Sequence, residues 1–305
     1  MTGAVPRAPA SPALRALLLG TMAVWGANLA VVKLLLESME PMLVSALRMV
    51  VAAVAVAAVV GLMMVRGQMR WPPLSRRQWW ALAGCAALMV YLNQIFFTQG
   101  VSRTAAANAA LIIALNPLVS SLLAALLLGD RLTPQRLAGV ALGFSGVAAV
   151  VLNRPEMALG GGGLGDLLVF GSVCTWVLGG VIVQRLARGL DPLFISAVLN
   201  VIGSLLLLLH LVVRPGPLVF DPGRIGVLTG VLVLLSGLLA TALGGIVWNR
   251  ALMVLGVART ALYSYWVPIF GVLFAVLLLG EPLTVWHGVG LAAVLGGTWL
   301  GTRSH

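Results

Sequence analysis

Long apolar runs, broken only by short segments that contain Gly, Pro and Arg, follow one another along the whole of this 305-residue chain. With 61% hydrophobic and only 9% charged residues, the chain has too few polar side chains to cover a water-soluble fold of this size. About 20 consecutive apolar residues are enough for a helix to cross the hydrocarbon core of a bilayer. The sequence therefore predicts an all-α integral membrane protein.

The breaks between these runs divide the chain into ten predicted transmembrane helices. We expect them near residues 13–36, 41–65, 79–99, 104–128, 134–152, 165–187, 191–213, 224–249, 256–279 and 283–302. The longest interruption, residues 153–164, contains an uninterrupted run of glycines from Gly160 to Gly163. Such a segment is typical of a flexible linker, and it falls at mid-chain.

The two halves of the sequence align with each other without a gap at an offset of 151 residues. At this offset Leu126–Asp130 meets Leu277–Glu281, and Trp25 meets Trp176. Further matched pairs are Leu132-Thr133 with Leu283-Thr284, Pro41 with Pro192, Pro117 with Pro268, and Gly139 with Gly290. Leucine-rich composition alone does not supply matched Trp and Pro residues, so the pattern indicates an internal duplication.

An odd number of helices in each half makes the two repeats inverted relative to the membrane. We expect one five-helix repeat over residues 1–152, the Gly-rich linker over 153–164, and a second repeat over 165–305. Inverted repeats recur in secondary transporters, which bind their substrate near the bilayer midplane between the repeats. The duplication therefore predicts a transport function as well as a fold.

The net charge of +11 comes from basic residues scattered in short loops, so it does not indicate a nucleic-acid-binding face. If the N-terminus is cytoplasmic, the loops on that side hold most of the Arg residues, such as Arg76 and Arg77. The positive-inside rule then predicts a multi-pass protein of the cell inner (plasma) membrane with both termini in the cytoplasm.

Four short motifs follow one another along the chain. They are Trp25-Gly26-Ala27-Asn28, Asn116-Pro117, Gly129-Asp130-Arg131-Leu132-Thr133 and Gly280-Glu281-Pro282-Leu283-Thr284. Together, and over nearly the whole chain, they resemble the EamA transporters of the drug/metabolite transporter superfamily.

The resemblance implies a carrier that exports small organic metabolites by alternating access. Amino acids, including aromatic or hydrophobic ones, are the leading substrate class. Efflux of drugs or toxic compounds, and transport of sugar-linked or phosphorylated metabolites, remain open. The resemblance also implies a cavity lined by the first, third, fourth, sixth, eighth and ninth helices. We expect no cofactor; the partners are the substrate and membrane lipid, and the chain is expected to be a monomer.

Polar groups within the fourth predicted helix are candidate substrate contacts, because such groups are costly in hydrocarbon. Asn108 and Asn116 are spaced to lie on one helix face. Pro117 removes a backbone donor and frees carbonyl groups one turn earlier, so we expect a kink or break there that takes part in gating. The alternative is an interhelical hydrogen bond beside a kink that serves packing.

Aromatic residues mark the matched region of the ninth predicted helix. Tyr263 and Tyr265 precede Pro268, which is the second expected gating position. Their rings suit apolar or cationic parts of an organic solute. The alternative is a belt of aromatic residues at the level of the lipid headgroups.

The first, third, sixth and eighth predicted helices supply further candidates. They are Trp25, Asn28, Asn93, Gln94, Trp176 and Trp248, all expected to contact substrate. In the alignment of the halves, Asn93 and Gln94 oppose Gly244 and Gly245, which leaves room for a cavity or permits close helix packing. For the Trp residues, packing in the core is the alternative.

Arg48 is the most isolated charge of the sequence, because it lies within the second predicted helix. Either its side chain extends to the membrane surface or its guanidinium pairs with a carboxylate of the substrate.

Acidic residues fall only at the ends of helices or in loops, so the carboxylate relays of proton-coupled pumps are missing from the pattern. Uncoupled transport or exchange is therefore expected. The sequence shows no clustered carboxylates, no His or Cys set with metal-ligand spacing and no nucleophile beside a base, so we expect neither an enzyme nor a metal site. A channel is the other alternative, but kinked, Gly-rich, duplicated helices favour alternating access.

Overall fold

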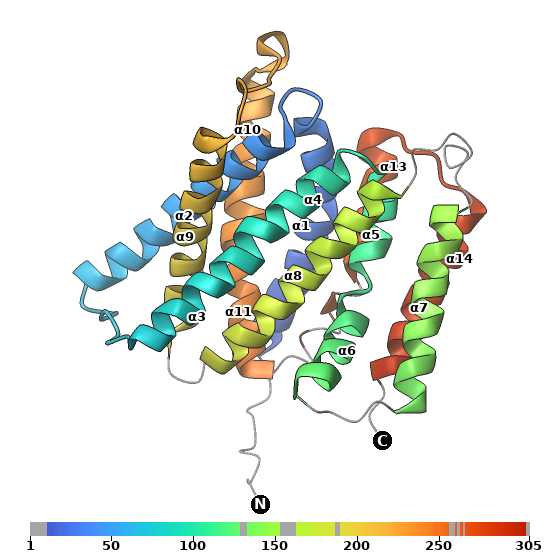
Figure 1. Cartoon of the computed structure of the whole chain (residues 1–305), viewed down its shortest axis with the longest axis horizontal. Helices are drawn as coiled ribbons and strands as arrows, with labels where there is room; N and C mark the ends of the chain where they lie inside the picture. Colours follow the sequence, from blue (N-terminus) through green and yellow to red (C-terminus); the bar gives the residue numbers. More distant parts are fainter. Residues whose placement is uncertain are drawn as a thin grey trace, which may run out of the picture.

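The computed structural model describes residues 11–128, 133–152, 163–186, 190–255, 260, 263–264 and 266–302. Their helices are, in chain order, α1 (Pro12–Leu35), α2 (Pro41–Val65), α3 (Arg76–Ala86), η1 (Ala87–Leu92), α4 (Asn93–Val101), α5 (Ala106–Ile113) and α6 (Asn116–Leu128). The second half holds α7 (Pro134–Leu152), α8 (Leu164–Leu186), α9 (Pro192–Val213), η3 (Pro222–Arg224), α10 (Val227–Leu235), η4 (Ser236–Leu243), α11 (Gly244–Leu255), α13 (Trp266–Leu279) and α14 (Val285–Thr302). These elements form one bundle (Figure 1).

The described part of the chain is helical and apolar, as the sequence predicts. Six segments are long and apolar enough to span a membrane: Pro12–Leu35, Pro41–Val65, Arg76–Val101, Leu164–Val183, Pro192–Val213 and Val227–Ala251. Four apolar helical segments are shorter: Ala106–Ser120, Leu137–Ala149, Trp266–Leu279 and Val285–Gly297. Between residues 11 and 302, the described residues form no strand, and the β-type pairing consists of one isolated bridge between Met39 and Phe220.

Local sequence signals set the helix starts. Pro occupies the first turn of α1, α2 and α9, where its missing N–H costs no hydrogen bond. The Ser11 hydroxyl accepts a hydrogen bond from Leu14 N, and the Asp191 carboxylate accepts one from Leu193 N. Ser75 and Gln78 form a capping box at the start of α3.

Three predicted helices differ from the structure in ways that matter for the site. The helix expected over 104–128 is interrupted at Ala114 and Leu115, so it consists of α5 and α6. Pro117 is therefore in the first turn of α6, where a proline is tolerated, rather than in a continuous helix. The end predicted at residue 249 is wrong, because helix α11 continues to Leu255. In the helix expected over 256–279, the described residue Ser264 forms a turn, and α13 begins at Trp266.

Two segments of π-helix interrupt otherwise α-helical spans. Segment η1 separates α3 from α4, and η4 separates α10 from α11. A π-helical turn holds an extra residue and disturbs the α-helical pairing of backbone groups. In η4, the Ala240 carbonyl accepts a hydrogen bond from Trp25 Nε1 at 2.8 Å. The carbonyl group that fixes the Trp25 ring is therefore in a π-helical segment.

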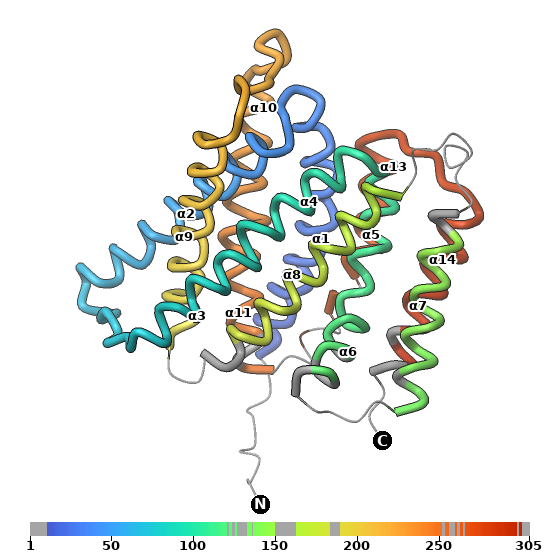
Figure 2. Tube along the Cα trace, viewed as in Figure 1, coloured from blue at the N-terminus to red at the C-terminus, as the bar shows by residue number. Residues whose placement is uncertain are grey.

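Helices of the first and second halves are interleaved (Figure 2). Helix α2 packs against α9, α4 against α8, α5 against α13, and α7 against α14. Gly26 permits the close approach of α1 and α13, because a Cβ at this position would lie 2.6 Å from Phe270 Cβ. Side chains from both halves thus share each packed cluster of the core.

Contacts between the ends of helices tie together one face of the bundle, the upper face in Figure 1. The Glu281 carboxylate accepts hydrogen bonds from Ala106 N at 2.8 Å and Ala107 N at 3.0 Å, so it caps α5. At the same face, both terminal nitrogens of Arg214 lie 2.5 Å from carboxylate oxygens of Glu40. This pair joins the start of α2 to the end of α9.

Candidate functional site

A cavity of about 190 Å³ lies between the helices of both halves. Its lining comes from α1, η1, α4, α5, α6, α8, η4, α11 and α13, as the resemblance implies, and also from α2 and α9. Of the described helices, α3, α7, η3, α10 and α14 supply no lining residue. The contributions of α2 and α9 are new relative to the sequence analysis, and they bring Arg48, Ser196 and Asn200 to the cavity.

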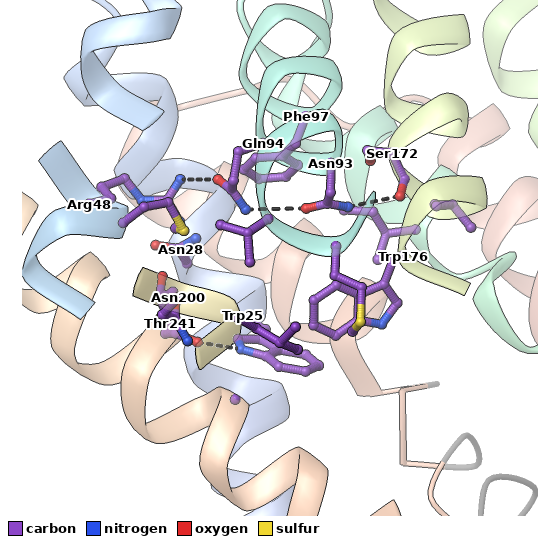
Figure 3. A pocket seen from close by; sticks show the side chains of 18 of the residues that line it. Trp25, Asn28, Arg48, Asn93, Gln94, Phe97, Ser172, Trp176, Asn200 and Thr241 are labelled. Atoms are coloured by element: carbon purple, nitrogen blue, oxygen red, sulfur yellow. Dashed lines mark hydrogen bonds between the residues drawn. The ribbon is translucent and has the colours of Figure 1, made fainter. Parts of the chain in front are cut away.

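A row of polar side chains crosses one side of this cavity (Figure 3). Arg48 Nη1 donates to Gln94 Oε1 at 3.3 Å, and Gln94 Nε2 donates to Asn93 Oδ1 at 3.2 Å. Asn93 Nδ2 then donates to the Ser172 carbonyl on α8 at 2.8 Å. These predicted residues are thus joined in one hydrogen-bonded row from α2 through α4 to α8.

Arg48 lies in the interior of the bundle, where its side chain is only 2% exposed. Its Nε donates to Ser236 Oγ at 2.5 Å, and Ser236 Oγ in turn donates to Asn28 Oδ1. The guanidinium carbon lies 5.9 Å from the centre of the Phe97 ring, a cation–π contact. The structure thus places Arg48 at the cavity and away from the membrane surface.

The Arg48 guanidinium contacts no carboxylate among the described residues, and its Nη2 has no acceptor there. Among the described residues that line the cavity, Arg48 is also the sole ionisable one. A buried cation without an ion-pair partner is costly, and an anionic group in the cavity would offset that cost.

Two tryptophan rings form, together with Phe97, the aromatic part of the lining (Figure 3). Trp25 and Trp176 meet edge to face, with ring centroids 6.1 Å apart. Trp248 does not line the cavity; it lies behind Trp25, with ring centroids 5.3 Å apart. The hydrogen bond from Trp25 Nε1 to the Ala240 carbonyl fixes the orientation of the first ring. The cavity therefore offers an apolar aromatic surface as well as the polar row.

A third group of lining residues, around Ser196 on α9, is polar and uncharged. Asn200 Nδ2 donates to the Ser196 carbonyl at 2.8 Å, and Asn249 Nδ2 donates to Ser196 Oγ at 2.6 Å. The Ser196 hydroxyl donates to the Pro192 carbonyl at 2.9 Å. Ser196, Asn200 and Asn249 all line the cavity.

The two amides predicted on the fourth helix lie in different surroundings. Asn116 lines the cavity, whereas Asn108 is buried and its Oδ1 is 3.1 Å from His287 Nε2 on α14. The expected common face assumed an unbroken helix, and the interruption at Ala114 and Leu115 removes that relation.

Of the two tyrosine candidates of the ninth helix, the described one, Tyr263, does not line the cavity. Tyr263 packs against the cluster that contains Met22 and Trp248, and Tyr265 is outside the described residues. Pro268 is buried in the first turn of α13, as Pro117 is in α6. Both prolines thus mark helix starts beside the cavity, and their gating role stays a prediction.

Sequence reasoning missed six polar lining or supporting residues. They are Ser172, Ser196, Asn200, Ser236, Thr241 and Asn249. A lone Ser in an apolar helix gives no distinct signal, and Asn249 precedes Arg250, which resembled a helix end. One signal was present: Ser196 and Asn249 stand 151 residues after Ser45 and Thr98, so polar pairs recur at matched positions of the halves.

A bundle of apolar helices that encloses a cavity with polar and aromatic walls defines a multi-pass membrane transporter. The comparison with protein families agrees with this class. The chain belongs to the EamA-like transporter family, whose model matches residues 15–152 and 163–303.

Individual relatives are similar over most of the chain. An uncharacterized transporter of Bacillus subtilis, YyaM, is 29% identical over 67% of this chain and 66% of its own length. A protein of Streptantibioticus cattleyicolor named as a probable terminal-alkyne amino-acid exporter is 29% identical over 93% of both chains. A solved crystal structure shares the fold, with a TM-score of 0.66 and 21% identity over 95% of this chain and 96% of its own.

Proposed function

We propose that this transporter has ten transmembrane helices in two inverted five-helix repeats. The π-helical segments support this, because residues 87–92 shifted by 151 fall within Ser236–Leu243. The Ser45–Thr98 contact of 2.8 Å likewise corresponds to Ser196–Asn249 in the second half. The inversion is supported by α2 and α9, which occupy corresponding positions but are antiparallel neighbours.

The proposed orientation places both termini in the cytoplasm of the cell inner membrane. Helix α1 begins and α14 ends at the lower face of the bundle in Figure 1. Exposed Arg66, Arg70, Arg76 and Arg77 lie in and beside the connection between α2 and α3, on the side opposite the Glu40–Arg214 pair. The positive-inside rule supports a cytoplasmic assignment of that basic side.

The proposed substrate is a small organic solute with a carboxylate and an apolar portion, of which amino acids with aromatic or hydrophobic side chains are the leading case. The observation that carries this proposal is the buried Arg48 guanidinium, which lines the cavity without a carboxylate partner. An arginine fork binds a carboxylate with two parallel hydrogen bonds. Trp25 and Trp176 provide the surface for the apolar portion of the solute.

Other substrate classes fit the lining less well. A cationic drug meets no carboxylate among the lining residues and is repelled by Arg48. A phosphorylated metabolite carries more than one negative charge, but the described part of the cavity wall holds a single cation, Arg48. The Streptantibioticus relative, named as an exporter of an amino acid, favours the amino-acid class and outward transport.

The proposed mechanism is alternating access without proton coupling, or exchange. The two halves would rock around the cavity, and the starts of α6 and α13, near Pro117 and Pro268, would supply the hinges. Both helices begin beside the cavity, where Asn116 and Val267 are lining residues. The absence of acidic lining residues within the described chain supports uncoupled transport.

Flux measurements in liposomes test this function. Purified protein is reconstituted, and flux of radiolabelled Phe, Trp, Met and Thr is followed with and without a pH gradient. We expect saturable flux that favours Phe, Trp and Met over Thr, needs no gradient and falls in Asn116→Ala. Flux that occurs only with the gradient would refute the uncoupled mechanism, and absence of flux from folded protein would refute the amino-acid class.

A further inference from the structure

Ser196 fixes the orientation of two amide side chains in the cavity wall. Asn200 must direct Nδ2 toward Ser196, because a backbone carbonyl only accepts hydrogen bonds. The Ser196 hydroxyl has one proton, which it donates to the Pro192 carbonyl at 2.9 Å. Its oxygen therefore accepts from Asn249 Nδ2, and that amide also has a defined orientation. In both side chains the amide nitrogen points toward Ser196, so the amide oxygen, Oδ1, points away from Ser196.

These two oxygens lack donors within the protein. Neither Asn200 Oδ1 nor Asn249 Oδ1 accepts a hydrogen bond from any described residue, although each side chain belongs to a residue that is only 8% exposed. Both residues line the cavity, so its contents can reach them. An amide oxygen in such a site is stabilised when a solute donates a hydrogen bond to it.

The matched position in the first half lacks this feature. There Ser45 contacts Thr98 Oγ1 at 2.8 Å, and Thr98 donates to the Gln94 carbonyl. Thr98 is fully buried and does not line the cavity. The amide of Asn249 in place of a Thr hydroxyl therefore adds an acceptor to one side of the cavity. An asymmetric pair of subsites suits a solute whose two ends differ in charge.

We infer that Asn200 and Asn249 form the subsite for the ammonium group of a zwitterionic substrate. This inference rests on the proposed function, in which Arg48 binds the carboxylate. Helices α2 and α9, which carry Arg48 and Asn200, pack directly against each other, so donors and acceptors meet within one cavity. An ammonium group has three donors and no acceptor, which matches oriented amide oxygens. The subsite selects amino acids over carboxylic acids that lack an amino group.

Binding measurements on three phenyl ligands test the subsite. Isothermal titration of the purified protein in lipid nanodiscs compares L-phenylalanine, 3-phenylpropionate without the ammonium group, and phenethylamine without the carboxylate. We expect the wild type to bind phenylalanine about tenfold more tightly than phenylpropionate, the size of one charge-assisted hydrogen bond. Asn249→Thr, which installs the residue of the matched position, should reduce that advantage, measured as the ratio of the two affinities, because one of the two amide oxygens is lost. Thermal unfolding of the variant serves as the control for folding.

A second variant makes the test independent of a loss of binding. Asn249→Asp places a carboxylate at the subsite, so it should increase affinity for phenethylamine at least tenfold. The ammonium subsite would be overturned if the wild type bound phenylalanine and phenylpropionate with equal affinity, or if Asn249→Thr lowered both affinities by the same factor. Neither result would contradict the binding of the carboxylate by Arg48. Phenylpropionate binding that is unchanged in Arg48→Gln would instead overturn the proposed role of Arg48. If none of the ligands binds, both proposals are refuted.

Discussion

Replacement of Arg48 by Gln separates recognition of a carboxylate from the stability of the bundle. The wild-type guanidinium is 2% exposed and donates to Ser236 and Gln94, but no described carboxylate contacts it. A hydrogen bond between an arginine and a carboxylate contributes about 1.5–3 kcal/mol. Loss of that interaction should lower kcat/KM for a carboxylate-bearing solute by about 10- to 150-fold, since 1.4 kcal/mol corresponds to a factor of ten.

Stability should respond differently to the same substitution. The variant removes two hydrogen bonds of a charged donor, each with a net contribution of about 1.5–3 kcal/mol. It also removes a buried cation that has no ion-pair partner among the described residues, whose desolvation costs several kcal/mol. The two effects are of similar size and opposite sign, so the unfolding temperature of Arg48→Gln should stay close to that of the wild type.

Two further variants complete this experiment. Arg48→Lys keeps the charge but loses the planar fork, so its transport rate should be intermediate. Arg103→Gln removes an equal charge from an exposed residue at the upper face and should leave transport unchanged. Proteoliposome flux and thermal unfolding in detergent are measured for each protein. Full transport in Arg48→Gln, or a loss of flux that follows a loss of folded protein, would refute the reasoning.

Three other substitutions have defined expected outcomes. Gly244→Ala would place a Cβ 2.6 Å from Trp25 Nε1, so thermal unfolding should show that the free energy of unfolding falls by about 1–3 kcal/mol. In the control variant Gly245→Ala, the Cβ meets no atom within 4 Å, so the free energy of unfolding should fall by less than about 1 kcal/mol. Trp25→Phe keeps an aromatic face but leaves the Ala240 carbonyl without its donor, so unfolding by denaturant should show a loss of about 1 kcal/mol. Glu281→Ala removes the cap of α5 and should cost about 1 kcal/mol by thermal unfolding; an unchanged stability would contradict the capping role.

The helical architecture follows from the sequence because apolar runs and prolines are local signals. Helices α2 and α7 begin and end at the predicted residues, and each starts at a proline, Pro41 and Pro134. A kink or break near Pro117 was predicted, but the residues at which α5 ends and α6 begins were not. A proline determines where a helix can start and not where the preceding helix stops.

The cavity was only partly predictable. In a helix that faces lipid on one side and protein on the other, both faces are apolar, so periodicity does not identify the buried face. Arg48 was recognised as isolated, but its partners Gln94 and Ser236 come from two other helices that only the fold brings together. Asn249 was missed for the same reason, because its role depends on Ser196, which lies 53 residues earlier.

The π-helical segment Ala87–Leu92 lets the chain hold one residue more without turning the side chains that follow. Its wider turn takes up the extra residue locally, so the helical segments on either side keep their orientation relative to each other. Deletion of one residue there would restore the α-helix and leave Asn93 and Gln94 facing the cavity. The same deletion in a regular α-helical segment would rotate all following side chains by about 100°. The loss of a single codon therefore preserves the specificity of the carrier in this segment and alters it elsewhere in the same span.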